Sequence, residues 1–227
     1  MNSMPRLLRD RQQGLSMIEL MVALLLSTLL LLGVLQLFSN SSHSDKVSSA
    51  LTRVQEGARV AFDLLAADAR RAGYQGCQQP NNKVTLSNNI VLPRDAITTS
   101  SGVNTSVTFR YATTTVTAIP MPGINKTCTD QDTYLFAVTY SNCTNGTSIC
   151  MNSSTSGGTQ TIVDGAQITA INLGYTAGGN TVWKSAGEIQ AADLPNVNLL
   201  QVSIRSQDAN QNVQRDFSST IDLRNRQ

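Results

Sequence analysis

The sequence predicts an α+β fold in which one long N-terminal helix packs on an antiparallel β-sheet domain. Three observations support this fold class: an uncharged apolar segment near the N-terminus, a helical stripe of apolar residues after it, and a polar remainder with short runs of alternating apolar residues. A chain of 227 residues is long enough for one domain with a hydrophobic core plus an anchor.

The apolar segment comes first along the chain. No Asp, Glu, Lys or Arg lies between Leu20 and Ser44, and the apolar part runs from Leu20 to Phe38. A membrane-spanning helix needs about 20 such residues. Because basic residues precede the segment, we expect a cytoplasmic N-terminus and an exported remainder. A secretory signal peptide cut after the segment, and an anchor that is never cut, are the two simpler alternatives.

Glu19 at the start of this segment argues against both alternatives. A carboxylate at the membrane edge is costly and is usually functional, so it needs a positive partner. No Lys or Arg lies within one helical turn of Glu19. Cleavage between Gly14 and Leu15 would create such a partner, because the new α-amino group of Leu15 would lie one helical turn away. In a filament the amine could instead pair with the Glu19 carboxylate of a neighbouring subunit.

The segment Gly14-Leu15-Ser16-Met17-Ile18-Glu19-Leu20 resembles the class III signal of type IV pilins and of type II secretion pseudopilins. The resemblance implies that a prepilin peptidase cuts after Gly14, that Leu15 is then N-methylated, and that Glu19 guides docking into a filament. It also implies a pilin-like fold. Three features depart from the usual pattern: Leu15 replaces Phe, Gly33 lies where many major pilins have Pro, and the leader has 14 residues unless translation starts at Met4. These departures argue against a major subunit.

An amphipathic helix is predicted after the apolar segment. Apolar residues recur there every three or four positions, at Val47, Leu51, Val54, Ala58, Ala61, Leu65 and Ala69. We expect one helix from the membrane to Arg71, with a possible break near Ser39–Ser42 and a stop at Gly73. The predicted division is a cleaved leader at 1–14, a transmembrane or filament-core helix at 15–42, an amphipathic helix at 43–73 and an extracytoplasmic β-rich domain at 74–227.

Alternating apolar residues predict the strands of that domain. The alternation covers residues 107–111, 134–140, 171–175, 202–204 and 217–223, with Gly-rich or Pro-containing turns between them. One apolar face per strand is typical of an antiparallel sheet covered on one side. Residues 141–160 are rich in Ser, Thr, Asn and Gly and predict a long surface loop. Trp183, the single tryptophan, is expected in the core.

The four cysteines, Cys77, Cys128, Cys143 and Cys150, all follow the apolar segment. An even number in an exported domain predicts disulfides. Cys143 and Cys150 are close in sequence, and their pairing would leave Cys77 for Cys128, although all three connectivities remain open.

No cofactor and no metal is expected. The cysteines lack the paired spacing of a zinc site, and His43 is the only histidine. Asp130 and Asp132 could touch calcium, but solvated loop carboxylates are the more ordinary interpretation.

Charge and motifs restrict the function. Three of 17 basic and one of 15 acidic residues lie in residues 1–14, so the rest of the chain is neutral. A neutral body argues against nucleic-acid binding, and no nucleic-acid partner is expected. No nucleophile elbow, phosphate-binding loop or dinucleotide fingerprint occurs, so we do not expect an enzyme.

The segment Ala69-Arg70-Arg71-Ala72-Gly73-Tyr74-Gln75-Gly76-Cys77 is similar to the helix end of PilW-type minor pilins, and residues 217–226 resemble that family's last strand. The resemblance implies a minor pilin that primes type IV pilus assembly near the tip, with other minor pilins, the major pilin and a large tip adhesin as partners. The protein would reside in the inner membrane and then in the surface pilus. The alternatives are a type II secretion pseudopilin, to whose J-type members the family is related, and a pilus-borne subunit for adhesion or DNA uptake.

Overall fold

The structure is a computed structural model that describes residues 16–77, 83–102, 105–123, 125–190, 192–208, 210 and 212–224. The chain divides into two compact units, Met1–Ser48 and Ser49–Gln227, and each is described by itself. The predicted cleavage site, Gly14–Leu15, lies outside the described residues.

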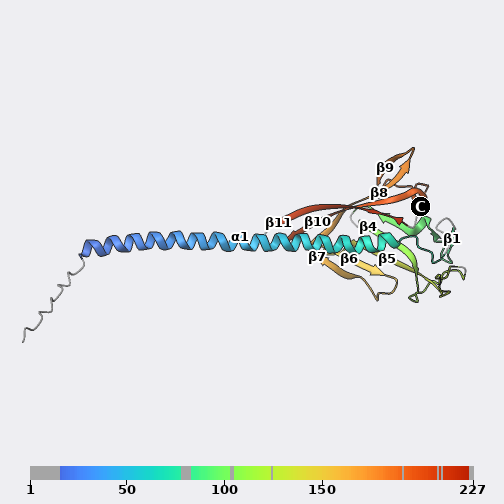
Figure 1. Cartoon of the computed structure of the whole chain (residues 1–227), viewed down its shortest axis with the longest axis horizontal. Coiled ribbons are helices and arrows are strands. Elements are labelled where there is room, and N and C mark those ends of the chain that lie inside the picture. Colours follow the sequence, from blue (N-terminus) through green and yellow to red (C-terminus); the bar gives the residue numbers. More distant parts are fainter. Residues whose placement is uncertain are drawn as a thin grey trace, which may run out of the picture. The chain divides into compact units, whose positions relative to one another are not determined.

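Helix α1, Met17–Arg71, is continuous, so the possible break near Ser39–Ser42 does not occur (Figure 1). Its few polar residues in the apolar part do not interrupt it, because their hydroxyls bond within the helix. Ser27 Oγ donates to the carbonyl of Ala23 at 2.6 Å, and Thr28 Oγ1 donates to that of Leu25 at 2.9 Å. Both hydroxyls are therefore hydrogen-bonded without water.

The helix ends at the predicted stop. Gly73 has φ +86°, a left-handed conformation that glycine adopts without strain. Its N–H donates to the carbonyl of Arg110 at 2.9 Å, and the N–H of Ala112 donates to the carbonyl of Tyr74 at 2.7 Å. The chain therefore leaves the helix directly along a strand.

A stripe of small and apolar residues covers the face of α1 that packs on the strands. Its buried members are Ala50, Val54, Ala58, Ala61, Leu65 and Ala69. The predicted stripe is confirmed from Val54 onward. At its beginning Ala50 is buried, whereas Val47 and Leu51 are only half-buried. Ala50 lies four residues before Val54 and so continues the same face, and the many alanines allow the strands to approach closely.

Eleven strands and two short 3₁₀ helices follow in the described part of the second unit. In chain order they are β1 Val84–Thr85, β2 Val91–Leu92, η1 Arg94–Ala96, β3 Ile97–Ser100, β4 Ser106–Thr113, β5 Tyr134–Asn142, β6 Ser148–Ser153, β7 Gln160–Asp164, β8 Ala166–Ala177, β9 Asn180–Ser185, η2 Leu194–Asn196, β10 Val197–Asp208 and β11 Val213–Asp222.

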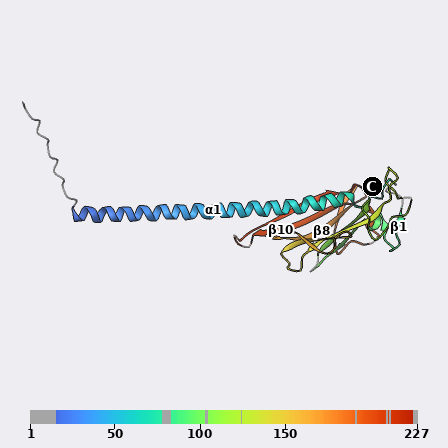
Figure 2. The same ribbon diagram turned by 90° about the horizontal axis from the view of Figure 1, so that it is seen from below.

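The strands form a five-stranded sheet, β3-β4-β5-β6-β7, a four-stranded sheet, β11-β10-β8-β9, and a small β1-β2 pair. Every pairing between these strands is antiparallel, which confirms the predicted α+β class. The division into two large sheets was not predicted. Figure 2 shows β8 and β10 beneath the end of α1.

The predicted loop at 141–160 is wrong. It contains strand β6, which pairs with β5 on one side and β7 on the other. Ser, Asn and Thr make up much of residues 141–160, and this composition is more typical of a loop than of a strand. Ile149 is fully buried, while Asn152 is exposed. A polar strand of this kind needs only a few inward side chains when its neighbours supply the ladder hydrogen bonds.

One core joins the helix and both sheets. Leu65 of α1, Phe109 of β4, Tyr140 of β5 and Leu200 of β10 belong to the same buried cluster. The rings of Phe109 and Tyr140 meet edge to face with centroids 6.1 Å apart. Burying a leucine such as Leu65 contributes about 1.5–3 kcal/mol, so the helical stripe is a substantial part of this unit's stability.

Candidate functional site

The first turn of α1 carries the predicted docking residue. Glu19 is exposed there, and its N–H donates to the carbonyl of Ser16 at 3.0 Å. A carboxylate in a first turn interacts favourably with the positive end of the helix dipole. No ion pair of Glu19 with another described residue occurs. The proposed partner, the amine of Leu15, and Gly14 lie outside the described residues, so their geometry stays a prediction.

The apolar part of α1 is uncovered. Its large apolar side chains between Met17 and Phe38 are 50–89% exposed in the isolated chain. Among the described residues, α1 is the one helix that is long and apolar enough to cross a membrane, judged by length and composition. A helix that is apolar on all sides is stable only when lipid or other protein surrounds it. Such a surface suits a bilayer or contact with other apolar helices.

A second carboxylate of α1 fixes the helix to the five-stranded sheet. The hydroxyl of Tyr111 donates to Asp68 Oδ1 at 2.8 Å, and that of Tyr140 donates to Asp68 Oδ2 at 2.5 Å. Burial raises the pKa of both tyrosines, and the hydrogen bonds to Asp68 raise it further. Both hydroxyls therefore remain protonated donors at neutral pH, and the cluster ties α1 to β4 and β5.

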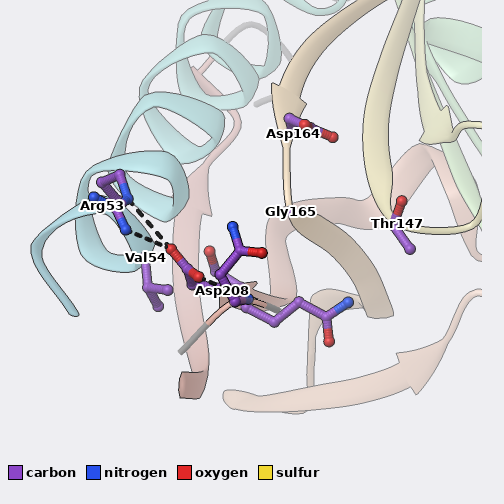
Figure 3. A pocket seen from close by; sticks show the side chains of 9 residues that line it. Arg53, Val54, Thr147, Asp164, Gly165 and Asp208 are labelled. Atoms are coloured by element: carbon purple, nitrogen blue, oxygen red, sulfur yellow. Dashed lines mark hydrogen bonds and ion pairs between the residues drawn. The ribbon is translucent and has the colours of Figure 1, made fainter. Parts of the chain in front are cut away.

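An ion pair joins the early part of the packed helix to the end of β10. Arg53 donates through Nη2 and Nε to Asp208 Oδ2, at 2.8 and 3.3 Å. Figure 3 shows this pair at a pocket of about 400 Å³. The Asp208 side chain is only 12% exposed, so water screens this pair less than an ordinary surface pair.

The turn beside this pocket requires glycine. Gly165 has φ +69°, and a Cβ there would lie 2.6 Å from the carbonyl oxygen of Gln207. The neighbouring Asp164 accepts a hydrogen bond from Ser148 Oγ at 2.5 Å. The charged side chains at this pocket, Arg53, Asp164 and Asp208, thus have partners within the chain. We interpret the pocket as a joint between α1, β7 and β10.

The structure contains the disulfides Cys77–Cys128 and Cys143–Cys150. This is the connectivity in which the two nearby cysteines pair with each other. The N–H of Cys77 donates to the carbonyl of Lys126 at 2.8 Å, so the segment after α1 runs beside the segment before Cys128. The second disulfide links the end of β5 to β6. Stable disulfides belong to an oxidising compartment, which fits the exported half of the predicted topology.

The described residues contain no group of His, Cys, Asp and Glu that could hold a metal ion. Asp130 and Asp132 lie near the same cation, with Lys126 Nζ 3.2 and 3.7 Å from their carboxylates. The two carboxylates therefore neutralise a lysine in a turn.

Sequence reasoning missed three features. Asp68 borders the apolar stripe, and this position is the one signal that could have indicated its role. The Arg53–Asp208 pair joins residues 155 positions apart, so no local sequence pattern predicts it. Trp183 was expected in the core, which is wrong: it lies on β9 and is 41% exposed. The edge position of β9 explains this exposure, because β9 has a neighbouring strand only on the β8 side.

The long N-terminal helix with an uncovered apolar half, taken together with two family matches, identifies a pilin-like protein of a type IV pilus or a related system. Residues 9–35 match the prokaryotic N-terminal methylation motif, a range that includes Gly14, Leu15 and Glu19. Residues 48–223 match the prepilin peptidase-dependent protein B family, and the chain belongs to that family. Neither the curated proteins nor the solved structures give a significant match.

Proposed function

We propose that this chain is a minor pilin that supports the priming of type IV pilus assembly, and that it is not an enzyme. The observation that carries the proposal is the uncovered apolar half of α1 within a match to the methylation motif at residues 9–35. Such a helix suits first the bilayer and then the interior of a filament. The folded unit, Ser49–Gln227, would remain outside the membrane.

The proposed processing follows from the charge at Glu19. A prepilin peptidase cuts between Gly14 and Leu15, and the new amine of Leu15 is N-methylated. A methylated amine keeps its positive charge at neutral pH and so remains a partner for a carboxylate. In the membrane this pair lowers the cost of burying Glu19, and in a filament the amine of one subunit meets Glu19 of the next.

The minor role rests on the sequence. Leu15 and Gly33 depart from the major-subunit pattern, and residues 69–77 resemble PilW-type minor pilins. In this proposal the subunit lies in the tip complex with other minor pilins, the major pilin and a large tip adhesin. It resides in the inner membrane before assembly, with its N-terminus cytoplasmic, and at the cell surface afterwards.

The deciding experiment is a clean deletion in the source organism, scored in parallel for surface pili, twitching motility and secreted enzymes. We expect loss of pili and twitching with normal secretion, and restoration by the wild-type gene. A Gly14→Trp gene should not restore pili, because the bulky residue blocks cleavage and leaves the precursor in the inner membrane. Loss of secretion with normal pili would instead assign the chain to a type II secretion pseudopilus.

A further inference from the structure

The β8–β9 hairpin carries an unusual surface. Val182 and Trp183 are adjacent on β9, and their side chains are 36% and 41% exposed. They point to opposite sides of the strand, because successive side chains alternate. β9 is also an edge strand of the four-stranded sheet (Figure 1). Exposed apolar side chains therefore lie on both sides of a free strand edge.

The hairpin is held in a defined conformation. Gly178 and Gly179 have φ +58° and +84°, so the two-residue turn has the positive φ angles that a type I′ turn requires. The indole of Trp183 lies against Gly174, where a Cβ would be only 2.9 Å from Trp183 Cζ3. At the hairpin's base, Lys184 Nζ pairs with Asp193 Oδ2 at 2.8 Å. The free edge is therefore preorganised.

The register shows which main-chain groups face outward. Ala177 and Asn180 flank the two-residue turn, and the pair that flanks such a turn is a hydrogen-bonded one. Pairs alternate along an antiparallel ladder, so Thr176↔Thr181 and Gly174↔Trp183 are pairs without hydrogen bonds. The N–H and C=O groups of Thr181 and Trp183 thus point away from β8.

The base of β9 supports this assignment. The N–H of Ser185, two residues after Trp183, donates to Glu188 Oε2 at 3.3 Å, on the side away from β8. The carbonyl of Ser185 accepts the N–H of Glu188 at 2.9 Å and that of Ile189 at 3.2 Å. The outward N–H and C=O groups of Ser185 are therefore already hydrogen-bonded within the chain. No described residue does the same for the main-chain groups of Thr181 and Trp183.

The usual protections of an edge are missing on β9. Proteins blunt free edges with proline, bulges or exposed charges. The strand, Asn180-Thr181-Val182-Trp183-Lys184-Ser185, has no proline, and its one charge is held by Asp193. The opposite edge of the same sheet, β11, carries the exposed charges of Arg215 and Asp222, besides Asp216, which pairs with Arg205. Protection of one edge and not the other indicates that β9 receives a partner.

We propose that β9 is a docking edge that takes an extended, uncharged segment of a neighbouring pilin-like subunit by strand addition. Outward donor and acceptor groups repeat there at Thr181 and Trp183, two residues or about 6.6 Å apart, a spacing that an extended backbone matches. Val182 and Trp183 then contact alternate side chains of the added strand. The absence of a free charge on Thr181, Val182 and Trp183 selects an uncharged segment. This inference rests on the proposed function, which supplies the neighbouring subunit.

The test uses the full chain in its own cells, with the photo-crosslinker p-benzoylphenylalanine at Val182. We expect a crosslink to a peptide of another pilin-like subunit. Thr181→Pro removes one outward N–H without touching a bond to β8, and should reduce the crosslink at least tenfold. Thr181→Val keeps the N–H and should change it less than twofold. Equal yields in the two variants, or a crosslink only to a second copy of this chain or to a protein that is not pilin-like, would overturn the proposal.

A second variant guards against misfolding. Trp183→Lys leaves the main chain intact and places a charge on the uncharged edge, so it should also abolish the crosslink. Val116→Lys is its control, because Val116 is 71% exposed and lies outside β9. Thiol labelling should show both disulfides formed in every variant. If the deletion abolishes pili but these variants crosslink normally, only the docking inference fails; if the deletion affects neither pili nor secretion, the proposed function fails first.

Discussion

Two carboxylates of one helix have opposite surroundings. Asp68 accepts two tyrosine hydroxyls and holds α1 on the five-stranded sheet. Glu19 is exposed in the first turn and has no ion-pair partner among the described residues. The first carboxylate is satisfied within the folded unit, so its role is structural. The second has no such partner among the described residues, which is why we propose a role in assembly for it.

Glu19→Ala should leave cleavage at Gly14 largely intact but impair entry into the filament. The peptidase acts on the bond after Gly14, whereas the pairing with the new amine needs the carboxylate. The measurement is mature protein in the inner membrane against the amount in sheared pili. Glu19→Asp is the matched control, since it keeps the charge. Normal filament entry of Glu19→Ala would refute the pairing.

Asp68→Ala should lower the free energy of unfolding by roughly 2–6 kcal/mol, because two buried hydroxyls lose their acceptor and each such loss costs about 1–3 kcal/mol. Chemical unfolding of the full chain in detergent, followed by near-ultraviolet circular dichroism, measures this. Asp68→Asn keeps one acceptor and should cost less. A similar loss in both variants would mean that charge, not hydrogen bonding, holds the cluster.

The same cluster predicts sensitivity to alkaline pH. The pKa of Tyr111 and Tyr140 is raised above the usual 10.0 by burial. The unfolded chain therefore loses these protons first, so stability is fully present below about pH 10 and falls as the pH rises above it. The free energy of unfolding can be measured from about pH 8 to about pH 11, a range around the ordinary tyrosine pKa. It should decline less steeply in a Tyr111→Phe/Tyr140→Phe variant than in the wild type. Equal slopes would exclude these tyrosines as the cause.

At the scale of elements, periodic patterns were predictable and their partners were not. The helix, its end near Gly73 and most of its buried stripe follow from apolar spacing that any helix must obey. β4 was equally visible, since Val107, Phe109 and Tyr111 alternate and all three are buried. β6 was missed because its apolar residues, Ile149, Cys150 and Met151, are consecutive rather than alternating, and because its pairing comes from neighbours in space.

The candidate site divides in the same way. Gly14, Leu15 and Glu19 form a local pattern within seven residues, so the sequence alone indicates them. The contacts of Asp68 and Arg53 need strands far along the chain. The free edge of β9 depends on strand order, which no single sequence reveals through periodicity.

The two disulfides close loops of very different length. In the chain-entropy model, Cys143–Cys150 contributes about 2–3 kcal/mol and Cys77–Cys128 about 4 kcal/mol. Replacing the first pair by serine should therefore destabilise the second unit less than replacing the second pair. Denaturant midpoints of the two double variants measure this order. The reverse order would show that β6 depends on its disulfide for pairing with β5.

At the scale of the whole molecule, the two units differ in surface: the first exposes apolar side chains, and the second buries them in a core. A chain of residues 49–227 keeps the buried stripe and all four cysteines. We expect it to be soluble without detergent, with both disulfides formed, whereas the full chain should require detergent. A chain of residues 74–227 is the matched control: it lacks the stripe, exposes the core and should aggregate. Aggregation of the 49–227 chain would show that the apolar half of α1 also supports the fold.

The Arg53–Asp208 pair has a consequence for the order of biosynthesis. Arg53 leaves the ribosome 155 residues before its partner, and the stripe that begins nearby is made before β10 and β11. Contacts between distant segments form late, because a long loop must close first. Until these strands have been made, the stripe of α1 therefore lacks its cover. A chain that stops before β10 should be cut by proteases more readily than a chain that includes β11.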